Sequence, residues 1–175
     1  MVFALTSPYT PTMDWTIAII AAAWAIILGG AGGMLTEIGE WYRNLKKPSW
    51  QPPDWLFGPA WTVILGLAGW SLYEAVTSAP TLGEKSFIGG LFLANFAAHF
   101  AWSPLFFKFK RPDFALVEVV FLWLSVLALV VLLMPYSQLA ALLNVPYLLW
   151  VSFAAFLNWK IVQLNGPFGK STAKS

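Results

Sequence analysis

Five long apolar stretches dominate this sequence, and each is long enough to cross a lipid bilayer as a helix. A spanning helix needs about 20 apolar residues, because the hydrocarbon core offers no water to satisfy an exposed backbone. Hydrophobic residues make up 59% of the chain and charged residues 10%, as is typical of membrane proteins. The sequence predicts an all-α integral membrane protein, a five-transmembrane-helix bundle with spans at residues 15–35, 56–76, 87–107, 114–134 and 139–162.

We expect one membrane domain, residues 13–165, preceded by a disordered N-terminal extension at 1–12 and followed by a flexible basic tail at 166–175. No secretory signal is expected, since the first 14 residues contain no Lys or Arg and the first apolar stretch is too long for a signal-peptide core. The chain has no Cys and one His, so neither a disulfide nor a self-sufficient metal site is predicted.

Nearly all basic residues lie in the first and third connections between spans or at the C-terminal end, and Lys85 is the exception. Because Lys and Arg beside membrane spans favour the cytoplasmic face, the N-terminus is expected outside, and the first loop and C-terminus in the cytoplasm. Orientation already accounts for these charges, so no nucleic-acid partner is predicted. A bacterial cell membrane is expected, with an organelle membrane as the alternative. The residues are Arg43, Lys46, Lys47, Lys108, Lys110, Arg111, Lys160, Lys170 and Lys174.

The connection between the first two spans is unusually aromatic and proline-rich. It contains Trp41, Tyr42, Trp50 and Trp55, together with three prolines within residues 48–53. The prolines exclude a continuous helix and favour a stiff, folded segment. Its aromatic side chains favour a lid over a binding site, and an aromatic belt at the membrane interface is the alternative.

The third span has two contrasting faces at helical spacing. Phe92, Asn95, His99, Trp102 and Phe106 share one face, which suits the interior of the bundle and a pocket. Small residues cluster on nearly the opposite face, where they would let a second helix approach closely, and they predict a homodimer contact. These residues are Gly90, Ala94, Ala97 and Ala101.

Two further spans carry a Trp near one end of an inward stripe. Trp61 shares a stripe with Leu65 in the second span, and Trp150 shares one with Ala154 in the fifth. Such tryptophans could stack on a flat macrocycle, although plain helix packing explains each stripe taken alone. The glycine-rich run at residues 29–33 is interpreted as a helix-packing or hinge element, because nothing in it matches a phosphate loop.

Glu118 is the only acid well inside a predicted span. A carboxyl group in hydrocarbon normally faces the bundle interior and finds a polar partner there. An interhelical hydrogen bond is therefore expected, with a neutral, buried carboxyl group as the alternative.

Four motifs occur in the order known from one membrane family. They are residues 41–53, the Phe-Gly-Pro-Ala-Trp that ends at Trp61, residues 102–107 and residues 146–150. Together they resemble the translocator protein (TspO/MBR) family, the tryptophan-rich sensory proteins. The resemblance covers about residues 13–165. It implies a five-helix bundle, commonly a homodimer, with a pocket beneath the first loop that takes tetrapyrroles such as protoporphyrin IX and haem.

The resemblance also implies which residues bind the ligand. Tyr42, Trp50, Trp61, Leu65, Trp102, Trp150 and Ala154 match positions of the family's pocket. The chain departs from the family pattern at His99, where Asn is common, and at Asn95, where Gln is frequent. His99 could bond a neighbouring helix, donate to a ligand carboxylate or ligate haem iron, and these alternatives stay open.

The predicted function is membrane tetrapyrrole binding, in stress-linked porphyrin sensing or trafficking, with Tyr42, Trp50, Trp61, Leu65, Asn95, His99, Trp102, Trp150 and Ala154 as ligand-binding residues. Porphyrin or haem is expected as a ligand rather than as an obligatory cofactor. No acid-base or nucleophilic constellation predicts a conventional enzyme. Light-dependent porphyrin degradation by pocket tryptophans and transport of porphyrins or other hydrophobic ligands are the alternatives.

Overall fold

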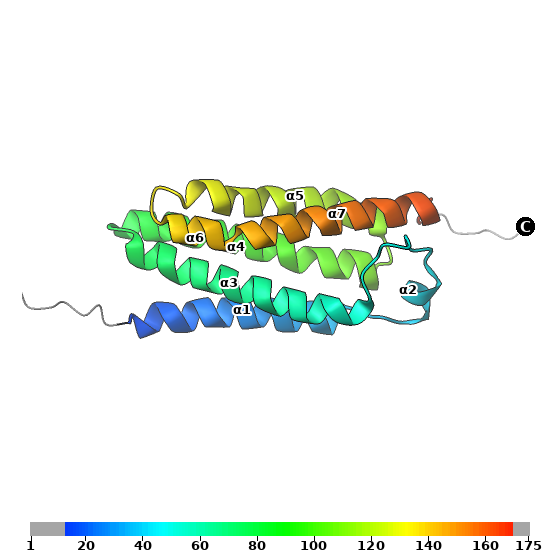
Figure 1. Ribbon diagram of the computed structural model, residues 1–175, viewed down its shortest axis with the longest axis horizontal. Helices are drawn as coiled ribbons and strands as arrows, with labels where there is room; N and C mark the ends of the chain where they lie inside the picture. The colour runs from blue at the N-terminus through cyan, green and yellow to red at the C-terminus, as the bar shows by residue number, and fades with distance from the viewer. Residues whose placement is uncertain (1–12, 170–175) are drawn as a thin grey trace, which may run out of the picture.

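The computed structural model describes residues 13–169, and within them the chain is a bundle of helices that lie along one long axis (Figure 1). The extension predicted at residues 1–12 and most of the predicted tail, residues 170–175, lie outside the described residues. No strand occurs among residues 13–169. The elements are α1 (Trp15–Leu35), α2 (Glu40–Asn44), a 3₁₀ turn (Asp54–Leu56), α3 (Phe57–Ser78), α4 (Leu82–Ser103), a π turn (Pro104–Lys108), α5 (Pro112–Leu132), α6 (Gln138–Leu143) and α7 (Val145–Asn165).

Within the described part of the chain, five helical segments are long and apolar enough to cross a membrane. Their outward faces are apolar as well: Ile19 and Ile26 on α1 are 64% and 72% exposed, which is the arrangement expected where lipid replaces water. The prediction of an all-α, multi-pass membrane protein is confirmed. The spans are Trp15–Leu35, Asp54–Ser78, Leu82–Lys108, Pro112–Leu132 and Gln138–Asn165.

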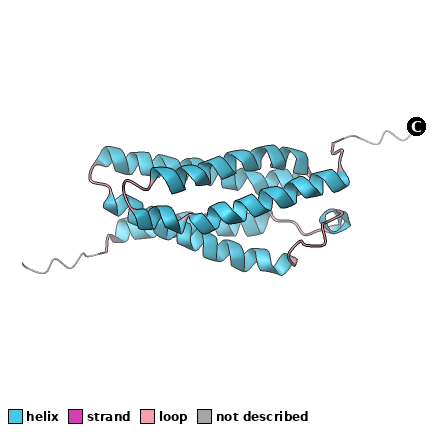
Figure 2. Cartoon of the chain, turned by 45° about the horizontal axis from the view of Figure 1, so that its top comes forward, coloured by secondary structure: helices cyan, strands magenta, loops and turns pink. Residues whose placement is uncertain are grey.

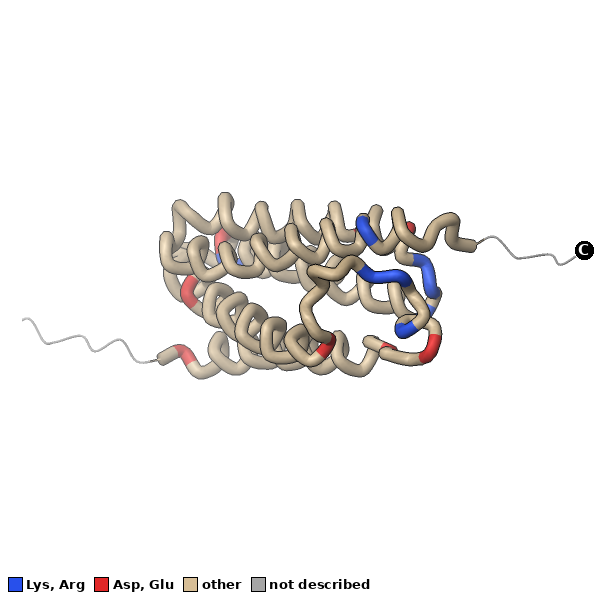
Figure 3. Tube along the Cα trace, turned by 45° about the vertical axis from the view of Figure 1, so that its right-hand side comes forward, with Lys and Arg blue, Asp and Glu red and all other residues tan. Residues whose placement is uncertain are grey.

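Among the described residues, Lys and Arg lie mainly at one end of the bundle, as Figure 3 shows in blue, while Lys170 and Lys174 lie outside the described residues. This end holds the connection between α1 and α3 and the connection between α4 and α5, whereas Lys85 lies at the start of α4 at the opposite end. The predicted segregation of charge is therefore present. Which side of the membrane this end faces stays a prediction.

Helix α4 begins at Leu82, five residues before the predicted start at residue 87. Thr81 explains the difference, because it caps the helix: its backbone N–H donates to Glu84 Oε2 at 3.0 Å, and its Oγ1 accepts from the Glu84 backbone N–H at 3.3 Å. Such reciprocal capping satisfies donors that the first turn leaves free. The hydrophobic pattern alone missed this polar first turn.

The predicted fifth span, residues 139–162, is two helices that meet at Asn144. Pro146 lacks the backbone N–H that a continuous helix would need, so the helix is interrupted beside it. The Asn144 side-chain amide donates to Ser71 Oγ at 2.7 Å and to the Ala140 carbonyl at 2.9 Å. The break is thus fastened to α3.

The small-residue face of α4 is uncovered on its outer side. Gly90, Ala94 and Ala97 are exposed, whereas Ala101 is partly buried. A Cβ added at Gly90 would meet no atom within 4 Å. This face is free to contact another helix, and the homodimer stays a prediction.

Helix α1 packs closely on α3 at Gly69. A Cβ placed on Gly69 would lie 3.1 Å from the Ala21 carbonyl oxygen and 3.2 Å from Ala25 Cβ. Small residues let two membrane helices approach in this way and gain dispersion energy. Gly66, one turn earlier, is exposed and meets nothing within 4 Å.

We expect Gly69→Leu to destabilise the bundle by about 1–3 kcal/mol, the usual cost of overpacking, and to lower the midpoint of thermal unfolding in detergent. Gly66→Leu is the matched control and should leave that midpoint unchanged or slightly higher. Equal midpoints for the two variants would contradict the close α1–α3 contact.

Candidate ligand-binding site

A cavity of about 520 Å³ lies inside the end of the bundle that carries the basic residues. Helices α1, α3, α4, α5 and α7 supply its walls, and the segment between α1 and α3 covers it. We call this segment, residues 36–56, the lid; Figure 2 shows its α2 turn set apart from the long helices. The lining residues are Leu28, Gly29, Gly32, Gly33, Thr36, Ile38, Tyr42, Asp54, Trp55, Phe57, Gly58, Trp61, Thr62, Leu65, His99, Trp102, Ser103, Phe107, Val119, Leu122, Trp150, Val151 and Ala154.

Most of the residues predicted to bind ligand meet around this cavity. The structure brings together Tyr42, Trp61, Leu65, His99, Trp102, Trp150 and Ala154, which come from the lid and from α3, α4 and α7. Helices that are far apart in the sequence converge here. The cavity they enclose has the size and the mainly apolar lining typical of small-molecule sites. Whether these side chains contact a ligand stays a prediction.

Trp50 and Asn95 do not line the cavity. Trp50 is 42% exposed and stacks on Phe156 of α7, with ring centroids 5.2 Å apart and an interplanar angle of 18°. Asn95 is fully buried. Asn95 therefore reaches the cavity only through its neighbours, and Trp50 fastens the lid to the bundle.

Trp61 stands at the centre of an aromatic group in the cavity wall. Its ring lies nearly perpendicular to three others, with centroid separations of 4.8 Å to His99, 6.0 Å to Tyr147 and 6.2 Å to Trp150. Edge-to-face contacts of this kind place the positive edge of one ring against the negative face of another. They hold Trp61 in one orientation.

A chain of hydrogen bonds continues from His99 into the bundle. His99 Nδ1 and the Tyr147 hydroxyl are 2.7 Å apart, and the Tyr147 hydroxyl also lies 3.4 Å from Asn95 Oδ1, to which it can donate. Asn95 Nδ2 donates to Ser125 Oγ at 2.9 Å, and Ser125 donates to the Leu122 carbonyl at 2.7 Å. The chain links α4, α5 and α7, so one of the alternatives for His99, a bond to a neighbouring helix, is realised.

Two indole groups of the wall lack partners. Trp102 Nε1 and Trp150 Nε1 are buried and make no hydrogen bond to any residue that the structure describes. A buried donor without an acceptor costs free energy, and such groups call for an explanation. Both residues line the cavity, but their two Nε1 atoms are covered by neighbouring protein atoms. An acceptor on a bound molecule would therefore reach them only after a local shift of the wall.

The lid is held in shape by polar contacts around Tyr42. Its hydroxyl donates to Asp54 Oδ1 at 3.1 Å, and Gln51 Nε2 donates to both of these oxygens at 3.2 Å. Burial, and then the neighbouring Asp54 charge, raises the pKa of Tyr42 to about 12, so its hydroxyl keeps its proton at neutral pH. Lys47 Nζ lies 3.5 Å from the centroid of the Tyr42 ring, which adds a cation–π contact. The predicted stiff, folded cover is present.

Sequence reasoning missed the contribution of α1 to the cavity. Gly29, Gly32 and Gly33 line it, although the run was interpreted as a packing or hinge element. A Cβ on Gly32 or Gly33 would meet no atom within 4 Å. Side chains at these positions would have room, so these two glycines are not required for close helix packing. Their lack of side chains leaves space for the cavity beside α1. The one signal in the sequence was the concentration of small residues near the end of the span.

The expected interhelical hydrogen bond of Glu118 is not formed. Its Oε2 is buried without a partner among residues 13–169. The Asn95–Ser125 hydrogen bond shows which residues of α4 and α5 face each other. The two helices are antiparallel, so seven residues after Asn95 and seven before Ser125 bring Trp102 to the level of Glu118. The residue of α4 expected at the level of Glu118 is Trp102, whose indole N–H makes no hydrogen bond among the described residues either.

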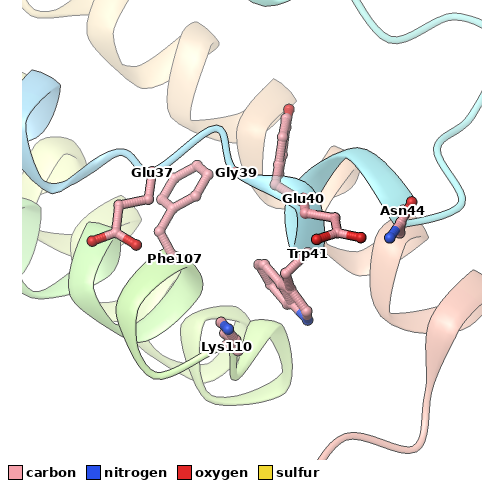
Figure 4. A pocket seen from close by; sticks show the side chains of 8 residues that line it. Glu37, Gly39, Glu40, Trp41, Asn44, Phe107 and Lys110 are labelled. Carbon is pink, nitrogen blue, oxygen red and sulfur yellow. The ribbon is translucent and has the colours of Figure 1, made fainter.

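A smaller cleft of about 380 Å³ lies at the outer side of the lid (Figure 4). In Figure 4 the rings of Phe107 and Trp41 stand on either side of it, with Lys110 below. Glu37 and Glu40 lie at its rim, so it carries charges of both signs. The larger cavity, in contrast, has Asp54 as its one carboxylate among the described lining residues.

The fold and cavity define a class: a membrane protein with five helical spans and an aromatic cavity beneath a folded first connection. The chain belongs to the TspO/MBR family, whose model matches residues 14–164. The resemblance inferred from the motifs is confirmed.

Individual relatives cover most of the chain. The tryptophan-rich protein TspO of Chlorobaculum tepidum is 38% identical over 142 residues, 80% of this chain and 90% of its own. The tryptophan-rich protein TspO of Archaeoglobus fulgidus is 36% identical over 152 residues, 85% and 97% of the two chains. The human translocator protein is 31% identical over 159 residues, 90% and 92%. The family thus spans bacteria, archaea and animals.

We expect Tyr147→Phe to destabilise the protein by about 1 kcal/mol, because it leaves His99 Nδ1 and Asn95 Oδ1 without their shared hydroxyl. Thermal unfolding in detergent would measure the loss. Tyr136→Phe is the control, since the Tyr136 hydroxyl makes no hydrogen bond within the described part of the chain. A Tyr147→Phe protein as stable as the control would mean that the polar chain contributes nothing.

Proposed function

We propose that this protein binds tetrapyrroles in the cavity beneath the lid and acts in stress-linked porphyrin sensing or trafficking. The observation that carries the proposal is the apolar, aromatic cavity beneath the lid, whose wall includes Trp102 and Trp150 with their unpartnered indole groups. Membership of the family supports it, because relatives bear the names tryptophan-rich sensory protein and translocator protein.

The cavity chemistry suits a flat, largely apolar molecule with acceptors at its edge. Burial of a macrocycle against Trp61, Leu65 and Trp150 would provide affinity through removal of apolar surface from water. After a local shift of the wall that uncovers them, the two indole N–H groups would donate to carboxylate or carbonyl oxygens and fix the orientation. Tetrapyrroles combine these features, since their side-chain carboxylates project from an aromatic ring system.

His99 can distinguish haem from a metal-free porphyrin. Its Nδ1 is engaged by Tyr147, whereas Nε2 makes no hydrogen bond among the described residues. Imidazole nitrogen is a common axial ligand of haem iron, and a hydrogen bond at the other nitrogen orients the ring. We therefore keep axial ligation as a proposed second role, tested separately from pocket binding.

Two features of the assembly belong to the same proposal. A homodimer would form through the exposed face of α4 that contains Gly90, Ala94 and Ala97. The end of the bundle that carries the basic residues and the lid would face the cytoplasm. In this arrangement the ligand would reach the cavity from the cytoplasmic side.

The binding test uses quenching of Trp fluorescence by protoporphyrin IX and haemin on the purified protein in detergent. Wild type should show saturable binding, and Trp61→Ala should weaken binding of both pigments roughly tenfold, since it removes the central aromatic contact. Trp70→Ala is the matched control. It removes a Trp from the same helix that is 51% exposed and lies outside the cavity.

His99→Ala separates the two proposed roles of this residue. Loss of the axial Soret signature of bound haemin, with protoporphyrin IX affinity unchanged, would support iron ligation. Equal affinities of all variants, or quenching that never saturates, would mean that pigments merely enter the micelle, and the tetrapyrrole assignment would fall.

A further inference from the structure

The lid behaves as one unit, because its own contacts close it on itself. Tyr42, near its start, is bonded to Asp54 and Gln51, near its end. Lys47, which lies between Tyr42 and Gln51 in the sequence, places its Nζ over the Tyr42 ring. Five residues of the lid line the cavity: Thr36, Ile38, Tyr42, Asp54 and Trp55. Any movement that admits a large ligand past the lid must therefore shift the unit relative to the helices.

One side chain at the end of α7 fastens the middle of the lid. Asn165 Oδ1 accepts from the Lys46 backbone N–H at 2.8 Å, and Asn165 Nδ2 donates to the Lys46 carbonyl at 2.8 Å. The same Nδ2 donates to the Ile161 carbonyl at 2.8 Å, so the amide is anchored in its own helix. A backbone–amide pair of this kind does not depend on the side chain of Lys46.

Trp50 makes a second contact with the same helix. Its ring stacks on Phe156 and meets Phe153 edge to face, at centroid separations of 5.2 and 5.9 Å. Both attachments lie on α7, whereas the two ends of the lid are continuous with α1 and α3. The start of the lid also packs on the turn after α4, where Tyr42 contacts Phe106 and Phe107 at centroid separations of 6.4 and 5.5 Å. The middle of the lid is held by the noncovalent contacts to α7.

We infer that Asn165 is a positioning residue for the ligand site: its amide latches the lid onto α7, and ligand entry and exit require this latch to release. The latch lies outside the cavity, so it controls the rates of binding without contacting the ligand. The kinetic part of this inference rests on the proposed function, whereas the attachment of the lid does not.

The attachment is tested without ligand by hydrogen exchange of the lid amides in the full-length protein. Asn165→Ala should accelerate exchange of the Lys46 amide and its neighbours roughly tenfold, the size expected for the loss of two exposed hydrogen bonds. Gln163→Ala is the matched control: it removes an amide at the same helix end, and within residues 13–169 the Gln163 side chain bonds only Lys160 of its own helix. Unchanged lid exchange in Asn165→Ala would overturn the latch.

Asn165→Asp provides a graded variant with the same shape. It keeps an acceptor for the Lys46 N–H but cannot donate to the Lys46 carbonyl, so lid exchange should lie between wild type and Asn165→Ala. Faster exchange that extends equally through α3 and α5 would indicate general unfolding and count against the latch.

The kinetic arm uses stopped-flow quenching with protoporphyrin IX. Asn165→Ala should raise the association and dissociation rates together, severalfold to tenfold, while Gln163→Ala matches wild type. A change in the dissociation rate alone would place Asn165 in the binding surface and contradict the latch. If wild type fails to bind the pigment but the Asn165→Ala lid still exchanges faster, the proposed function falls and the lid attachment stands.

Discussion

The hydrogen-bond chain through Tyr147 is the interaction on which the site depends. It joins His99 and Asn95 of α4 to Tyr147 of α7 and Ser125 of α5 within an apolar interior. Polar groups in hydrocarbon are costly unless they satisfy one another, so these side chains fix how the three helices face each other. This alignment turns His99 and Trp102 toward the cavity, and Trp61 then packs against the His99 ring. The aromatic wall is a consequence of the polar chain behind it.

Above that wall the bundle does not close upon itself. Gly29, Gly32 and Gly33 leave the stretch of α1 after Leu28 without bulky side chains at the cavity, and the lid covers the remaining space with Tyr42 and Trp55. The lid differs from the helices in how it is stabilised, because a few polar and aromatic contacts replace extensive helix packing. Segments with few buried contacts open at low free energy. A stable wall and a releasable cover therefore follow from the same sequence.

Much of this structure could be predicted, because a membrane reduces the choice to helices and makes long apolar runs easy to recognise. The inward positions of Trp61, His99 and Trp150 followed from helical spacing, and the pocket role assigned to them followed from the family motifs. The failures have local physical causes. Leu82 starts α4 because Thr81 caps it, and Asn144 interrupts the fifth span beside Pro146. Trp50 packs on α7 rather than in the cavity because the fold of the lid sets its direction, which spacing in a loop cannot reveal. The Asn165–Lys46 pairing joins residues too far apart for any sequence pattern to indicate it.

The central claim is that the cavity beneath the lid holds the ligand. A structure of the full-length protein with protoporphyrin IX in a lipid nanodisc tests it most directly. The account predicts the pigment between α1, α3, α4 and α7, with its edge oxygens within hydrogen-bond reach of Trp102 Nε1 or Trp150 Nε1. A pigment bound on the outer helix faces, or in the charged cleft beside Lys110 with the cavity left empty, would contradict it.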